Sequence, residues 1–107
     1  MAEEITVRDL AERLKAKKPV LIVDVREDWE REICRIPGDV HIALNTLPER
    51  VAEFRAPEGG EIVVYCHGGV RSLMAAGFLE QQGVPGVLSL AGGIDAWSDI
   101  DPAVPRY

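Results

Sequence analysis

The sequence has little of three things: positive charge, cysteine and long apolar runs. Its 107 residues carry 12 Lys and Arg against 18 Asp and Glu, which gives a formal net charge of −6. This balance argues against a nucleic-acid-binding face, which needs clustered basic residues, and against binding to an anionic membrane surface. The longest apolar stretches, such as residues 20–23, are far shorter than the roughly 20 residues that span a bilayer.

The N-terminus carries the acidic residues Glu3 and Glu4, where a secretory signal would need a basic stretch followed by an apolar run. We therefore expect a cytoplasmic protein. In that compartment the two cysteines, Cys34 and Cys66, are expected to be thiols and not a structural disulfide. The length fits one compact core, so residues 1–107 are predicted to form a single domain. We expect a monomer, because no exposed apolar stripe stands out.

Strand-like and helix-like segments alternate along the chain, which predicts an α/β sheet domain. The continuous apolar runs are typical of parallel strands that are buried on both faces. Strands are expected at 20–25, 40–43, 61–65 and 87–90, and helices at 7–17, 27–32, 48–54, 72–82 and 93–97. Thr6 is the expected N-cap of the first helix and Gly83 the C-cap of the fourth. Gly77 lies inside that fourth helix, where close packing on the sheet is its expected reason.

The most informative segment joins an apolar strand to a helix and reads Cys66-His67-Gly68-Gly69-Val70-Arg71-Ser72. In open α/β sheets, ligands bind at the carboxyl ends of the strands. The two glycines let successive backbone N–H groups point at one centre, the helix start carries partial positive charge, and Arg71 adds a full one. Each of these features stabilises an anion at the sulfur, so we expect Cys66 to be largely thiolate at neutral pH.

The length of this loop separates two chemistries. Arg71 stands five positions after Cys66, whereas cysteine phosphatases place their arginine six positions after the cysteine. The smaller ring suits a sulfane sulfur better than a tetrahedral phosphate. A phosphatase or arsenate-reductase relative would also need a general acid, for which Asp24 and Asp39 are the candidates, but nothing in the sequence places either one at the thiol.

The chain resembles the rhodanese family, and specifically its single-domain members, over nearly its whole length. The matching pieces, in the family's order, are Asp24-Val25-Arg26, Ile36-Pro37-Gly38, the Cys66 loop, and Leu90-Ala91-Gly92-Gly93 followed by Trp97. One departure is Cys34-Arg35, where the family usually has Gly-His before the Ile-Pro-Gly turn.

The resemblance implies a doubly wound, five-stranded parallel sheet with helices on both faces. It also implies that the Cys66 thiolate takes a sulfane sulfur from thiosulfate, a small sulfur-containing anion, or from a persulfide. The sulfur then passes to a thiophilic acceptor, which is cyanide, a thiol or a protein. By the same resemblance, the amides from His67 to Ser72 hold the persulfide, Arg71 orients an anionic donor, and no cofactor is needed.

Several other residues are candidates for functional or supporting roles. Asp24 and Arg26 are expected to form an ion pair that braces the loops, as structural support for the site. Cys34 is expected to fill a gap as a small hydrophobe, the alternative being a resolving thiol for Cys66. His67 is expected at the rim of the site and not as a general base.

Trp29 and Trp97 are expected to be packing residues and not substrate platforms. The cysteines and histidines lack a zinc spacing, which argues against a metal site. Three alternatives to an enzyme of sulfur transfer stay open: a persulfide carrier or regulatory module for a partner protein, a phosphatase relative, and a purely structural domain.

Overall fold

The computed structural model describes residues 2–107 and contains one five-stranded parallel sheet. The strands are β1 (Glu3–Ile5), β2 (Val20–Asp24), β3 (Val40–His41), β4 (Glu61–Tyr65) and β5 (Val87–Leu90). Their order is β1-β5-β4-β2-β3, so the chain starts at one edge, passes through β2 to the opposite edge at β3, and returns through the central β4 to β5 beside β1. The doubly wound parallel sheet expected from the resemblance is confirmed.

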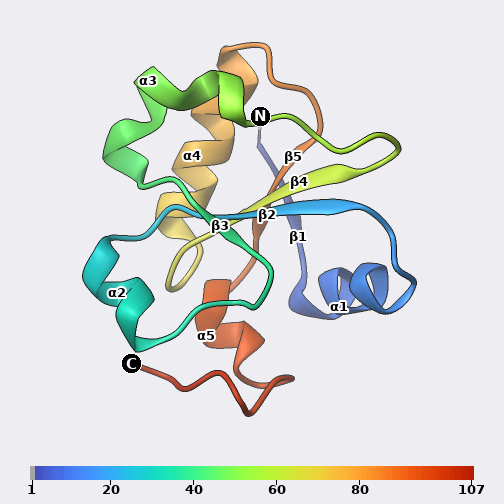
Figure 1. The fold of residues 1–107 in the computed structure, drawn as a ribbon, viewed down its shortest axis with the longest axis vertical. Coiled ribbons are helices and arrows are strands. Elements are labelled where there is room, and N and C mark those ends of the chain that lie inside the picture. The colour runs from blue at the N-terminus through green and yellow to red at the C-terminus, as the bar shows by residue number, and fades with distance from the viewer. Residues whose placement is uncertain (1) are drawn as a thin grey trace.

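Helices cover both faces of the sheet (Figure 1). They are α1 (Val7–Lys15), α2 (Asp28–Ile33), α3 (Leu47–Arg50), α4 (Val70–Gln81) and α5 (Gly93–Trp97), with 3-10 turns at Leu44–Thr46 and Val51–Glu53. One apolar cluster joins the sheet to α3 and α4, and the other joins it to α1 and α5. Within residues 2–107, no helix has the length and apolar character needed to cross a membrane.

Strand β4 shows why the apolar runs are continuous. Successive side chains of a strand point to opposite faces, so Ile62 and Val64 pack toward α3 and α4, while Val63 and Tyr65 pack toward α1 and α5. All four are fully buried. The next residue in the alternation, Cys66, therefore belongs to the α3–α4 face.

The structure corrects several predicted boundaries. Strand β1 was not predicted from the residues, because it has only three residues and only Ile5 is buried. Helix α1 ends at Lys15 and not at residue 17, and the strand expected at 40–43 is limited to two residues. Helix α4 begins at Val70, two residues before its predicted start, because Gly69 adopts φ +109° and turns the chain directly into the helix.

One of the two expected helix caps is present. The Thr6 hydroxyl accepts a hydrogen bond from the Asp9 amide at 3.1 Å, as an N-cap does. The C-cap of α4 is Gln82 and not the predicted Gly83, which follows it with φ +85°. The explanation expected for Gly77 is wrong, because a Cβ at this position would meet nothing within 4 Å. Gly77 is therefore not required by close packing on the sheet.

Candidate active site

Cys66 lies directly after β4, at the carboxyl edge of the sheet, and is 1% exposed. Its Sγ accepts hydrogen bonds from the amide of Gly69 at 3.1 Å and from the amide of Ser72 at 3.3 Å. The Ser72 hydroxyl oxygen lies 3.6 Å from the sulfur. Two N–H donors directed at one sulfur favour negative charge on it.

The loop closes around the sulfur because two neighbouring segments hold its backbone. The amides of Ile94 and Asp95 donate to the carbonyl oxygens of Cys66 and His67, at 2.9 and 3.0 Å. Gly93 makes this contact possible, because a Cβ at its position would lie 2.4 Å from the His67 carbonyl oxygen. The start of α5 is therefore part of the loop's support, a role that the sequence reading did not give to Gly93.

Two buried serine hydroxyls connect the loop to strand β5. Ser72 Oγ lies 2.8 Å from Ser89 Oγ and donates to the Gly69 carbonyl oxygen at 3.2 Å. Both serines are fully buried. Sequence reasoning missed Ser89, although a single hydroxyl within the apolar strand β5 was a usable signal.

The guanidinium of Arg71 is paired with a carboxylate. Its two terminal nitrogens donate to the two carboxylate oxygens of Glu30, at 2.6 and 2.8 Å. This pair, despite the burial of Glu30, lowers the pKa of that carboxyl to about 2. The pKa of Arg71 is raised, mainly by Glu30 and to a smaller extent by Cys66. Arg71 is thus near the thiol, but its charge is shared with Glu30, which the sequence reading did not identify.

Tyr107 joins the loop to the rest of the site. Its hydroxyl donates to Glu30 at 2.7 Å and accepts from Arg26 at 2.9 Å. Its ring stacks on His67, with centroids 4.2 Å apart and an angle of 17° between the planes. Burial, with the hydrogen bond to Glu30, raises the pKa of Tyr107 to about 12. His67 therefore lies against an aromatic ring, which fits a rim residue better than a base for Cys66.

Asp24 and Arg26 form a fully buried ion pair with two hydrogen bonds of 2.9 Å. Burial alone would lower the pKa of Arg26, but its bonds to Asp24 and Tyr107 raise it overall. The same guanidinium donates to the Cys34 carbonyl oxygen at 2.6 Å. The pair connects β2 to the segment after α2, as expected of a loop brace.

The two candidate general acids are held by arginines. Arg31 donates to Asp39 at 2.8 and 2.9 Å and to Asp24 at 3.2 Å. The Tyr65 hydroxyl also donates to Asp39. Both carboxylates are therefore engaged in an ion-pair network, and neither donates to the Cys66 sulfur among the contacts of residues 2–107.

The second thiol packs on the other side of the sheet. Cys34 belongs to the apolar cluster with α1 and α5, whereas Cys66 belongs to the cluster with α3 and α4. Trp97 is buried as expected, with its indole N–H unpaired within residues 2–107. Trp29 is 56% exposed and packs on Tyr107 in a T-shaped arrangement, with ring centroids 6.3 Å apart.

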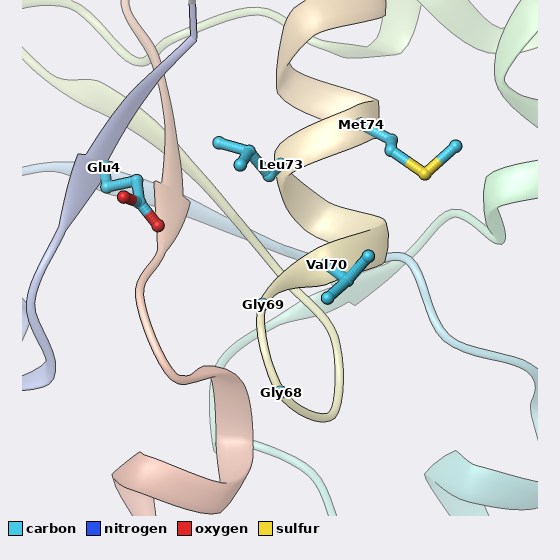
Figure 2. Close-up of a pocket in the computed structure, with 6 residues that line it drawn as sticks. All are labelled: Glu4, Gly68, Gly69, Val70, Leu73 and Met74. Atoms are coloured by element: carbon cyan, nitrogen blue, oxygen red, sulfur yellow. The ribbon is translucent and has the colours of Figure 1, made fainter.

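Two pockets adjoin the loop. The first has a volume of about 430 Å³ and is drawn in Figure 2, where Leu73 and Met74 extend from different sides of α4 above the glycines. Its lining residues are Glu4, Gly68, Gly69, Val70, Leu73 and Met74. The second has a volume of about 300 Å³ and is lined by Val25, Glu27, Ala43, Leu44, Asn45 and Arg71.

Comparison with known proteins agrees with this geometry. Residues 6–100 match the model of the rhodanese-like domain. The chain belongs to the rhodanese family. A sulfurtransferase from Allochromatium vinosum is 38% identical over 98 residues, which cover 92% of this chain and 90% of that protein. The solved rhodanese-like domain protein from Staphylococcus aureus is 32% identical, with a TM-score of 0.83 and 98% of each chain covered.

Rhodanese domains of this kind also occur inside larger proteins. This chain is 33% identical over 114 residues to the adenylyltransferase and sulfurtransferase MOCS3 of Aedes aegypti, and the match covers 98% of this chain but 26% of that protein. Membership of a sulfurtransferase family follows from these matches. They leave the sulfur donor, the acceptor and the roles of individual residues to be argued from the site.

Proposed function

We propose that this rhodanese domain is a sulfurtransferase that carries sulfane sulfur as a persulfide on Cys66. The observation that carries the proposal is the cradle around Sγ, in which the amides of Gly69 and Ser72 donate to the sulfur at 3.1 and 3.3 Å. Fixed donors stabilise charge without reorganising during the reaction. The same loop, from His67 to Ser72, would hold the added sulfur.

The proposed cycle has two displacements. The Cys66 thiolate attacks the sulfane sulfur of thiosulfate, the S–S bond of the donor breaks, and sulfite leaves with the electron pair. A nucleophilic acceptor, such as cyanide or a thiol, then attacks the outer sulfur of the persulfide. The Cys66–sulfur bond breaks, the thiolate is regenerated, and no cofactor or external oxidant is consumed.

Thiocyanate formation from thiosulfate and cyanide tests this proposal. Wild type and the Cys34→Ser control should both turn over, while Cys66→Ser should not. Turnover that survives in Cys66→Ser, or a folded wild type that forms no thiocyanate from thiosulfate and no new persulfide from a persulfide donor, would contradict the proposal. Hydrolysis of phosphate esters or reduction of arsenate would then be tested in its place.

A persulfide carrier for a partner protein is the second candidate, and one observation favours it. Three apolar side chains at the first turn of α4, beside the loop, are exposed: Val70 at 73%, Met74 at 63% and Leu73 at 39% (Figure 2). A carrier would gain sulfur on Cys66 but turn over cyanide slowly. Substituting Leu73 and Met74 with Ser should then weaken transfer to a protein acceptor and leave transfer to cyanide unchanged.

Both candidates take residues 1–107 as one domain that acts as a monomer in the cytoplasm. Sedimentation of the purified chain tests whether it is a monomer. A dimer at micromolar concentration would contradict it.

A further inference from the structure

The pocket next to Arg71 presents opposite charges on an otherwise apolar lining. Val25, Ala43 and Leu44 form its apolar part, while Glu27, Asn45 and Arg71 supply polar groups. Val25 also packs in the same buried cluster as Cys66, and Arg71 belongs to the loop around the sulfur. At about 300 Å³, the pocket is at the small end of the range for ligand sites, which runs from about 300 to 1,000 Å³. It suits a ligand of amino-acid size.

Arg71 has donors left for a ligand. A guanidinium carries five N–H groups, and the bidentate pair with Glu30 occupies two of them. The Arg71 side chain is 33% exposed. The remaining N–H groups can therefore bind a carboxylate that enters the pocket.

Glu27 supplies the opposite charge. Glu27 is the N-cap residue of α2, and its exposed side chain accepts from the Trp29 indole at 3.2 Å. A carboxylate offers about four acceptor positions, so the group retains capacity for an ammonium. The pocket thus has a cation and an anion on its walls, and the cation, Arg71, belongs to the loop that surrounds the proposed nucleophile.

The charges near the pocket favour a ligand that carries both signs. Arg71 contributes one positive charge, while Glu30, paired with it, and Glu27, on the pocket wall, contribute two negative charges. A zwitterion would pair its carboxylate with Arg71 and its ammonium with Glu27 at no net cost in charge.

We propose that this pocket binds the zwitterionic head of an α-amino-acid thiol, such as cysteine, and that Cys66 exchanges sulfane sulfur with that thiol. The inference rests on the proposed function and names the substrate class for it. In one direction the thiolate of the amino acid attacks the outer sulfur of the Cys66 persulfide, the Cys66–sulfur bond breaks, and the Cys66 thiolate leaves. In the other direction the persulfide of the amino acid gives its sulfur to Cys66. Electrons balance in both, so no oxidant is needed.

The test loads Cys66 with sulfur and measures the rate of its loss to three small thiols. L-cysteine carries both charges, cysteamine lacks the carboxylate, and 3-mercaptopropionate lacks the ammonium. The variants are Glu27→Gln and Glu27→Ser, of which the second retains a good helix N-cap without the charge. Glu12→Gln, at an exposed position of α1 on the other side of the molecule, is the matched control (Figure 1).

The readout is the ratio of second-order rates for L-cysteine and 3-mercaptopropionate, in which the intrinsic difference between the two thiols cancels from variant to variant. An exposed or half-exposed ion pair contributes about 0.2–1 kcal/mol, so both Glu27 variants should lower the ratio by about 1.4- to 5-fold. Glu12→Gln should not change it. Replacing Arg71 with Met should lower the corresponding ratio of L-cysteine to cysteamine.

A ratio that stays the same in both Glu27 variants, while sulfur still leaves Cys66 for all three thiols, would overturn the zwitterion site and leave the proposed function standing. If wild type could not be loaded with sulfur from any donor, the proposed function itself would have failed. The two failures are therefore distinguishable in one set of samples.

Discussion

The pair of Glu30 and Arg71 makes a quantitative prediction about stability and pH. Glu30 is 3% exposed and its pKa falls from an ordinary 4.5 to about 2, mainly through the hydrogen bonds from Arg71. A change of one pKa unit corresponds to about 1.4 kcal/mol, so this shift amounts to about 3 kcal/mol of folding free energy. Because Arg71 is one-third exposed, solvent screening reduces the expected contribution to about 2 kcal/mol.

The sign follows from which state takes up the proton first. As the pH falls, the unfolded chain protonates Glu30 near pH 4.5, while the folded chain keeps it ionised to about pH 2. The contribution is therefore complete above about pH 5 and is lost as the pH falls toward 2. At pH 3 about two-fifths of it should remain.

The variant Glu30→Gln isolates this effect, because the other carboxylates titrate in both proteins and cancel in the difference. Urea unfolding at pH 7 should show Glu30→Gln to be less stable than wild type by about 2 kcal/mol. By pH 3 the difference should fall below about 1 kcal/mol. A difference that is the same at pH 7 and pH 3 would refute the reasoning, because the loss would then come from packing and not from the charge.

Four further predictions concern stability and the thiols. Gly93→Ala places a Cβ against the carbonyl oxygens of Cys66 and His67 at a positive φ, so thermal unfolding should show a loss of more than about 2 kcal/mol. Gly77→Ala has open space and should instead gain about 1 kcal/mol; equal effects would contradict the contacts described. Arg26→Ala leaves Asp24 without its buried partner and should cost about 3–5 kcal/mol, with a smaller effect on turnover per folded molecule; lost turnover at unchanged stability would overturn the brace. Mild oxidation should give no disulfide between Cys34 and Cys66, since they pack on opposite faces of the sheet, and a disulfide found by mass spectrometry would revive the resolving-thiol alternative.

The sequence predicted correctly those strands that are marked by a continuous apolar run with turn residues after it. Strands β4 and β5 match their predicted bounds, because each is an apolar run ended by turn residues. Strand β1 was missed because it is defined by its pairing with β5, which lies far away in the sequence, and not by a local apolar run. The start of α4 was placed two residues late because the backbone of Gly69, and not a side-chain cap, begins the helix.

The site divides in the same way. The sequence contains the loop from Cys66 to Ser72, and its order of residues predicted where the cradle would form. Glu30 and Tyr107 were missed because they reach the site through contacts that span 41 and 77 residues of sequence. No local pattern distinguishes Glu30 from the other acidic residues of α2, so only the packing of α2 against the loop reveals that it shares the charge of Arg71.

The most direct test of the account is the intact mass of the protein after incubation with thiosulfate or a persulfide of cysteine. Wild type and Cys34→Ser should each gain the mass of one sulfur atom, which cyanide or dithiothreitol should remove. Cys66→Ser should gain none. A sulfur that attaches equally to Cys66→Ser, or a folded wild type that gains no sulfur from either donor, would contradict the claim that Cys66 carries sulfur as a persulfide.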